Sequence, residues 1–255
     1  MRAEQAHQPN GHAPAVRVGA HRLDHETAMS QRVAQFQCFP LFSGISPADC
    51  RTIISAAHEK EFHPRQSFFL EGQPVRQTLL LISGCAKITQ LGQNGTEVIL
   101  RLHGPSDIVG GCKSCSPATH HSTARALQLS TALVWEAAVF EAFTLRFPIL
   151  RCNIGRILGR RLLEMEERFR EISTEKVAPR LGRTIIRLLT QVGQRVNGSV
   201  EINLSREELA QLTGTTLFTV SRLLSAWERQ GIVSTRRRAV MISNHQALLE
   251  LSDSE

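Results

Sequence analysis

The stretch Leu204–Val233, which reads LSREELAQLTGTTLFTVSRLLSAWERQGIV, decides the fold. Ser205 is followed three residues later by Glu208. This is the capping-box pattern with which a helix begins, because each side chain satisfies a free backbone N–H group of the other residue. Gly214 favours the left-handed backbone that ends a helix. We therefore predict a short helix between Ser205 and Gly214.

A second helix is predicted directly after the first. Thr215 or Thr216 can cap its N-terminus, and its apolar residues recur at helical spacing. These residues are Leu217, Val220, Leu224 and Trp227. Ala210, Gly214 and Val220 supply the small and apolar side chains needed where two helices cross at a tight turn. The pattern predicts a helix-turn-helix, and an ordinary helical hairpin with surface polar residues is the alternative.

The polar face of the second helix carries groups that can recognise DNA. Arg222 can bond O6 and N7 of guanine, and Ser221 can reach a base edge or a phosphate. Thr216 and Thr219, near the helix start, suit phosphates. The full set of candidate DNA contacts is Arg206, Thr215, Thr216, Phe218, Thr219, Ser221, Arg222, Ser225, Arg236, Arg237 and Arg238.

The segment Ile232–Ile242 alternates in polarity, as expected of a two-stranded ribbon, with Arg236–Arg238 at its tip. We interpret it as a wing that lies against the DNA backbone. The charge distribution agrees with this interpretation. Lys176–His245 holds eleven basic and four acidic residues, so it accounts for the whole net charge of +7. A basic C-terminal third is the electrostatic footprint of nucleic-acid binding, although solvated basic faces are also common.

The region from Phe36 to about Trp135 predicts short antiparallel strands. The β-type runs are Ser67–Leu70, Thr78–Ser83, Ala86–Leu91 and Glu97–Leu102. Glycines separate these runs, and Asn94 with Gly95 is a hairpin signal because both residues tolerate a positive φ. Such a pattern is typical of an antiparallel barrel or roll.

The period changes to that of a helix after Glu136, and Pro148 suits the first turn of a helix. Five apolar residues then recur at steps of four and three, with charged residues between them. They are Leu158, Leu162, Met165, Phe169 and Ile172. This heptad pattern predicts a dimer interface formed with a second copy of the helix. The alternative is a helix packed on its own domain.

The chain is therefore predicted to be an α+β protein in four parts. These are a flexible tail (1–34), a β-roll sensor domain (35–145), a dimerisation helix (146–174) and a winged helix-turn-helix DNA-binding domain (175–255). The tail has four histidines, and a metal-binding arm is the alternative interpretation, but their spacing is irregular.

Several classes of protein are not supported by the sequence. No apolar run is long enough to span a bilayer, and the N-terminus lacks the apolar stretch of a secretory signal, so we expect a cytoplasmic protein without a membrane partner. The six cysteines are then free thiols or ligands. Motifs typical of enzymes, such as a Walker loop, a dinucleotide fingerprint or a zinc-protease helix, are not found.

The order of β-roll, long helix and winged helix-turn-helix resembles the bacterial CRP/FNR family, typified by the cyclic-AMP receptor protein and the fumarate-nitrate reduction regulator. The resemblance covers about Phe36 to Leu249. It rests on Leu81–Ile88 (LISGCAKI), Asn94–Glu97 (NGTE), Asp107–Gly110 (DIVG) and Thr219–Leu224 (TVSRLL). It implies a cyclic-nucleotide-binding-like roll and a homodimeric transcription regulator that binds two-fold symmetric double-stranded DNA. RNA polymerase is the further partner expected of such a regulator.

The sequence departs from the family at three places. Phe218 stands where the recognition helix usually has a glutamate, so we expect a different base pair in the half-site. Gly111-Cys112 and His121-Ser122 stand where the cyclic-nucleotide branch has its Gly-Glu and Arg-Ser pairs, which argues against cyclic AMP. The tail has no cysteine before Cys38, which argues against the iron–sulfur cluster of the oxygen-sensing branch.

The expected effector pocket contains Cys112 and Cys115, with His120, His121 and Ser122 shortly after. A C-x-x-C with neighbouring histidines is a candidate thiol redox pair or metal site, and the lysine between the cysteines favours the thiolate. Haem is a further candidate cofactor. The alternatives are that the thiols only pack and that His120 faces solvent. The identity of the metal, the effector and the operator, and the choice between activation and repression, are not determined by the sequence.

A second functional hypothesis is a redox or ligand-binding module whose C-terminal domain contacts a protein partner. The Arg222→Ala variant separates it from the first, because only a DNA-reading domain needs this guanidinium.

Overall fold

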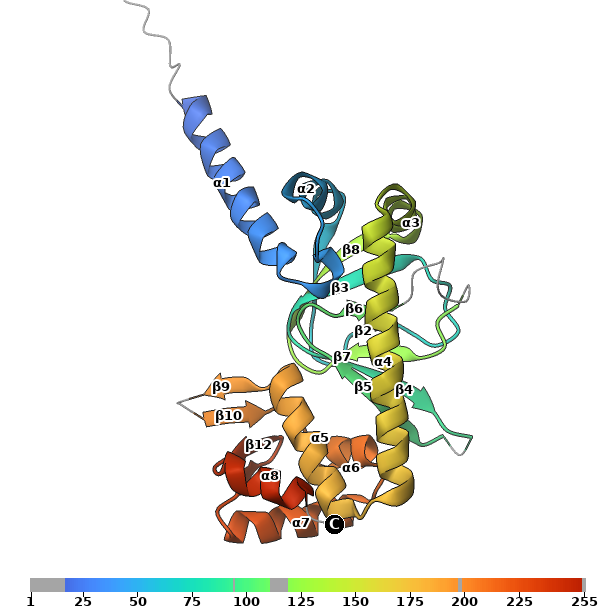
Figure 1. The fold of residues 1–255 in the computed structure, drawn as a ribbon, viewed down its shortest axis with the longest axis vertical. Coiled ribbons are helices and arrows are strands. Elements are labelled where there is room, and N and C mark those ends of the chain that lie inside the picture. The colour runs from blue at the N-terminus through green and yellow to red at the C-terminus, as the bar shows by residue number, and fades with distance from the viewer. Residues whose placement is uncertain (1–16, 94, 111–118, 197–198, 254–255) are drawn as a thin grey trace, which may run out of the picture.

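The computed structural model describes residues 17–93, 95–110, 119–196 and 199–253. A β-roll and a smaller C-terminal domain lie at opposite ends of one long helix, α4 (Pro148–Thr174) (Figure 1). Both helices and strands build the protein, as the α+β prediction requires. None of the described helices is long and apolar enough to cross a membrane.

The N-terminal segment differs from the predicted flexible tail, because residues 17–34 belong to the helix α1 (Arg17–Gln37). Val33 and Phe36 at its C-terminal end are buried. They lie in one apolar cluster with residues of η1 (Pro40–Phe42) and α2 (Pro47–Ser55). The burial of these two side chains, one helical turn apart, fixes the end of α1 on the roll.

The roll consists of two four-stranded antiparallel sheets, in the orders β1-β8-β3-β6 and β2-β7-β4-β5. Their strands are β1 (His58–Phe62), β2 (Ser67–Phe69), β3 (Gln77–Ser83), β4 (Ala86–Leu91), β5 (Glu97–His103), β6 (Ile108–Val109), β7 (Thr123–Ala126) and β8 (Ser130–Glu136). The strands predicted at 67–70, 78–83, 86–91 and 97–102 are confirmed by β2 to β5. Helix α3 (Ala137–Arg146) follows β8.

The turn between β3 and β4 depends on Gly84. Its φ is +89°, and a Cβ at this position would lie 2.5 Å from the Cα of Ser130 and 2.6 Å from the carbonyl oxygen of Leu129. A side chain therefore fits neither the backbone conformation nor the space. The turn between β3 and β4 can approach the start of β8 here only because residue 84 is glycine.

Helix α4 begins at Pro148 and is anchored to the roll by Asn153. The buried amide of Asn153 donates hydrogen bonds to the carbonyl oxygens of Leu41 (2.9 Å) and Ser43 (2.8 Å). These bonds replace water for three polar groups, so they hold the N-terminal half of the helix in place.

The C-terminal domain packs its helices against a four-stranded sheet of order β11-β12-β10-β9. Its elements are α5 (Val177–Val192), β9 (Gln194–Val196), β10 (Ser199–Ile202), α6 (Arg206–Thr213), α7 (Leu217–Arg229), β11 (Val233–Arg236), β12 (Ala239–Ile242) and α8 (His245–Asp253). The predicted helix-turn-helix is α6 and α7, and the predicted ribbon is β11 and β12.

The roll and the C-terminal domain are in contact through β5. Leu102 lies in the same apolar cluster as Leu188 and Leu212 of the C-terminal domain. The guanidinium of Arg168 on α4 donates to the carbonyl oxygens of Leu100 and Leu212, the latter at 3.0 Å. A single arginine thus joins both domains to the long helix.

Candidate DNA-binding face and effector pocket

The turn between α6 and α7 has the predicted construction. Ser205 and Glu208 form the capping box at the start of α6, and Gly214 ends this helix with φ +61°. Thr216 is the cap of α7, since its Oγ1 accepts from the backbone N–H of Thr219 at 3.2 Å. Ala210 and Val220 are buried where the helices meet. The geometry is that of a helix-turn-helix with α7 as its outer helix.

The outer face of α7 carries the residues predicted to read DNA. Phe218 is 76% exposed, and Arg222 and Ser225 are also exposed. Ser221 and Thr219 are half-buried. Arg222 makes no ion pair with any residue in the described part of the chain, so its guanidinium is available to a ligand.

The wing lies beside α7 because Thr235 of β11 is bonded to it. The backbone N–H of Thr235 donates to Glu228 Oε1 at 2.7 Å. Arg206, a predicted DNA contact, donates from Nη2 to the hydroxyl of Thr235 at 3.0 Å and so ties α6 to the wing. This positioning role of Arg206 has no signal in the sequence, because its partner lies in a later element.

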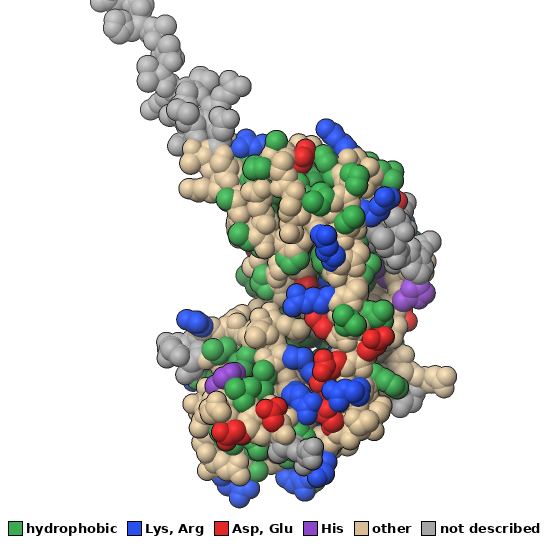
Figure 2. All heavy atoms as spheres, in the orientation of Figure 1, with side chains coloured by type: hydrophobic (Ala, Val, Ile, Leu, Met, Phe, Trp, Pro, Cys, Tyr) green, Lys and Arg blue, Asp and Glu red, His purple; other side chains and the backbone are tan. Residues whose placement is uncertain are grey.

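The three arginines of the wing tip are exposed. Arg236 lies 3.9 Å from Glu201, and Arg238 lies 4.0 Å from Glu208. Both carboxylates are buried but both arginines are exposed, and at these distances the pairs hold the guanidinium groups only weakly. Basic side chains also appear at the lower end of the molecule in Figure 2, the end at which α7 lies in Figure 1. This end presents positive charge to a partner.

The predicted dimer residues lie on α4 and are all exposed in the single chain. Their exposed fractions are 42% for Leu158, 57% for Leu162, 56% for Met165, 73% for Phe169 and 46% for Ile172. A helix packed only on its own domain would bury such a stripe. The exposure favours the dimer interface over the alternative.

The predicted effector residues His120, His121 and Ser122 line one cavity of about 200 Å³ between the roll and α4. The ring of His120 is buried and stacks on Phe69 with centroids 3.7 Å apart, so it does not face solvent. Burial lowers the pKa of His120. Cys112 and Cys115 lie outside the described residues.

Two arginines that the sequence analysis missed reach the same cavity, Arg101 from β5 and Arg161 from α4. They stand at positions other than the family's Arg-Ser pair. No group of three or more His, Cys, Asp or Glu side chains within the described part of the chain is arranged to hold a metal ion. Burial raises the pKa of the Cys50 thiol to about 11 and that of Cys85 to about 12, which makes both thiols poor nucleophiles.

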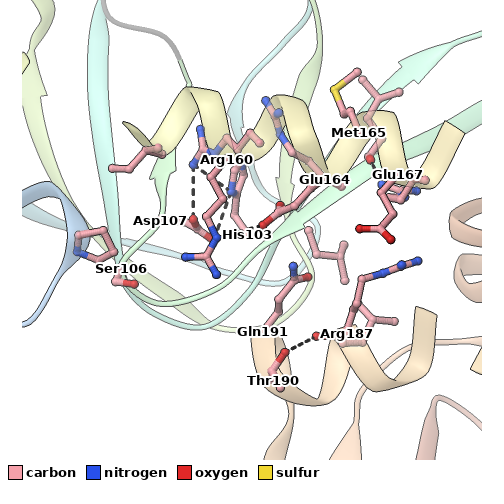
Figure 3. A pocket seen from close by; sticks show the side chains of 18 of the residues that line it. His103, Ser106, Asp107, Arg160, Glu164, Met165, Glu167, Arg187, Thr190 and Gln191 are labelled. Carbon is pink, nitrogen blue, oxygen red and sulfur yellow. Dashed lines mark hydrogen bonds and ion pairs between the residues drawn. The ribbon is translucent and has the colours of Figure 1, made fainter. Parts of the chain in front are cut away.

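A larger cavity of about 640 Å³ lies between the loop after β5, helix α4 and helix α5 (Figure 3). His103 and Asp107 line it from the roll, and Arg161 lines it from α4. His103 Nδ1 is 3.4 Å from Asp107 Oδ2, and Arg161 donates to the carbonyl oxygen of Ile108 at 2.8 Å. Burial alone would raise the pKa of Asp107, but the hydrogen bond with His103 and the nearby positive charges lower it.

Burial lowers the pKa of His103 from 6.5 to about 4, so this ring is neutral in the folded protein. The unfolded chain binds a proton at this residue between these pH values and the folded chain does not. We therefore expect the free energy of unfolding to decrease by about 3 kcal/mol as the pH falls from 6.5 to 4. Urea titrations across this range should show a shallower decrease for His103→Gln. His121→Gln, on an exposed ring, is the matched control, and an equally shallow decrease in that variant would contradict the assignment.

The comparisons with known proteins agree with this geometry. Residues 59–147 match the family of the cyclic nucleotide-binding domain, and residues 179–251 match the Crp-like helix-turn-helix domain. The fold and the site thus define a domain of the cyclic nucleotide-binding family joined to a helix-turn-helix DNA-binding domain.

Individual relatives are distant but extend over most of the chain. The chain is 24% identical to a CRP-like cAMP-activated global transcriptional regulator of Mycobacterium tuberculosis over 82% of its own length and 94% of that protein. It is 26% identical to the fumarate and nitrate reduction regulatory protein of Vibrio cholerae, over 76% and 78%. The structure of FixK2 from Bradyrhizobium japonicum has the same fold, with a TM-score of 0.68, 21% identity, and coverage of 78% of this chain and 98% of that one. The chain belongs to the CRP/FNR family of transcription regulators.

Proposed function

We propose that the regulator binds a two-fold symmetric DNA operator as a homodimer, with one α7 in the major groove of each half-site. The observation that carries this proposal is the exposed Arg222 on the outer face of α7 with a basic wing fixed beside it. A guanidinium in this position can bond O6 and N7 of one guanine. A two-fold symmetric protein binds half-sites whose symmetry mirrors its own.

The second part of the proposal concerns signal transfer through α4. The small cavity, the exposed apolar stripe and the contact with the C-terminal domain all involve this helix. A ligand or a redox change in the roll would shift the seam between two α4 helices and thereby the spacing of the two recognition helices. We infer a redox, metal or haem signal rather than cyclic AMP, since Cys112 and His121 replace the nucleotide-binding residues of the family. RNA polymerase is the proposed further partner.

Contacts of the wing with phosphate should make DNA affinity depend steeply on salt. Replacing Arg237 by glutamine is expected to weaken binding to all DNA sequences alike. It should also reduce the slope of log K against log salt by about 0.9 for each half-site. Fluorescence anisotropy with labelled duplexes at several salt concentrations measures both effects. Arg195→Gln is the matched control, because Arg195 is an exposed arginine of β9, outside the wing. An equal loss of slope in this variant would show that Arg237 contributes only through the net charge of the protein and not through a contact between the wing and phosphate.

A further inference from the structure

The larger cavity has the composition of an anion site. Six arginines and three acidic residues line it, so the charge of its walls is positive. They are Arg101, Arg156, Arg160, Arg161, Arg168 and Arg187, with Asp107, Glu164 and Glu167. Its volume of about 640 Å³ lies within the range of small-molecule sites.

Several of these charges are satisfied within the protein. Arg161 lies 3.4 Å from Asp107, and Arg187 makes two bonds to the buried carboxylate of Glu171, at 2.5 and 2.8 Å. Arg160 lies 3.4 Å from Glu164. Such pairs hold their guanidinium groups in place, but they leave Arg101 without a carboxylate partner among the residues that the structure describes.

Two buried nitrogen atoms at the cavity have no hydrogen-bond partner in the described part of the chain, Nε of Arg101 and Nε2 of His103. His103 is only 2% exposed, so water does not reach most of its ring. Burial and the neighbouring charges of Arg161 and Arg168 lower the pKa of Arg101 to about 10. The Nε–H group of Arg101 is a buried donor without a partner, which costs free energy, and an oxyanion beside it would remove that cost. The neutral ring of His103 donates to Asp107 through Nδ1, so its Nε2 can bond the oxyanion only after the ring takes up a proton together with the ligand.

Part of the cavity wall is apolar. Its walls include Leu100, Ile157, Met165 and Leu188. The two kinds of side chain suit an organic anion that has both a charged group and an apolar body. Arginine recognises carboxylate and phosphate with the same two-pronged geometry, so the shared chemistry is that of an oxyanion.

We propose that this cavity binds a small organic anion, with its oxyanion group at Nε of Arg101, beside His103, and its body against the apolar walls. The site is separate from the cavity of His120 and Ser122, although Arg101 and Arg161 border both. Its walls come from the roll, α4 and α5. A bound anion therefore contacts both domains and stabilises one arrangement of them. An effect on operator affinity, which rests on the proposed function, follows by linkage.

The test uses calorimetric titration of the full chain with two probes, inorganic pyrophosphate and malonate. The proposal expects at least one of them to bind, and which one binds shows whether the site takes phosphate or carboxylate. Arg101→Met and His103→Leu should each lower the association constant at least about tenfold. Arg151→Met, an exposed arginine of α4 outside the cavity, and Ser122→Ala, in the smaller cavity, are the matched controls and should bind as the wild type does.

A second measurement separates ligand binding from a structural role. Without anion, Arg101→Met should raise the melting temperature, because it removes an unpaired charge from a half-buried position. A lower melting temperature would show that Arg101 holds the fold, and would overturn the proposal. So would a failure of both probes to bind, or an equal loss of binding in Ser122→Ala. Failure of the proposed function is a different result, in which the wild type binds a probe but no DNA.

Discussion

Replacing Arg222 by alanine is expected to abolish sequence-specific DNA binding while the protein stays folded and dimeric. Each half-site loses one two-pronged contact with guanine, which discriminates between bases by about 1–3 kcal/mol. A dimer has two such contacts, so we expect a loss of roughly 2–6 kcal/mol in specific affinity. Gel-shift assays with the operator and with unrelated DNA measure this directly, because non-specific binding should change far less.

Arg229→Ala is the matched control for this experiment. Arg229 is also an exposed arginine of α7, but it lies in the last turn of the helix, away from the end that enters the groove. Its replacement should leave the specific affinity nearly unchanged. If Arg222→Ala kept its preference for the operator, or if a protein partner but no DNA were bound, α7 would not be the reading element.

The second large effect is expected at the exposed stripe of α4. Because both copies of α4 carry the change, replacing Leu162 by glutamate places two charges in the dimer interface. It also removes two buried leucine side chains, worth about 1.5–3 kcal/mol each. We therefore expect the dimer dissociation constant to rise more than about a hundredfold. Analytical ultracentrifugation measures the dissociation constant, and operator binding should fall with it because both half-sites are needed.

Leu163→Glu tests whether position matters rather than hydrophobicity. Leu163 is 67% exposed, against 57% for Leu162, but it lies outside the heptad pattern. This variant should remain dimeric. Dissociation of both variants to the same extent would indicate that the interface uses a different face of α4, and a dimeric Leu162→Glu would exclude the heptad seam.

The roll and the helix-turn-helix could be predicted from the sequence because the patterns that indicate them are local. The capping box of Ser205 and Glu208 and the left-handed Gly214 each involve only a few neighbouring residues. Strands β3 to β5 are bounded by glycines and by a hairpin signal. Local rules of this kind depend on backbone geometry, so they can be recognised without the tertiary structure.

The first helix was not predictable in the same way. α1 has a weak apolar pattern, and what fixes its end is the burial of Val33 and Phe36 against the core of the roll. The composition and the missing apolar periodicity of residues 17–34 favoured a flexible tail. Tertiary packing decides the structure of such a segment, because an isolated helix with few apolar residues is only marginally stable.

The larger cavity was also missed, for a different reason. Arg101, His103, Arg161 and Arg187 come from three elements that are far apart in the sequence. In the sequence, each of them resembles an ordinary surface residue or one of the charged residues between the apolar heptad positions. Only the packing of β5, α4 and α5 around one cavity brings them together. The predicted effector residues His120, His121 and Ser122 were recognised because they are consecutive and match a position in a known family.

The central claim is that a symmetric dimer reads DNA through α7, and selection of binding sites from random DNA tests it most directly. Purified wild-type protein and the Arg222→Ala variant would be incubated with the same pool of random duplexes, and the bound DNA sequenced. We expect the wild type to enrich two inverted half-sites whose centres lie about one helical turn apart, with a guanine in each. The variant should enrich neither. Enrichment of a single or direct-repeat site, or an identical motif in both proteins, would contradict the account.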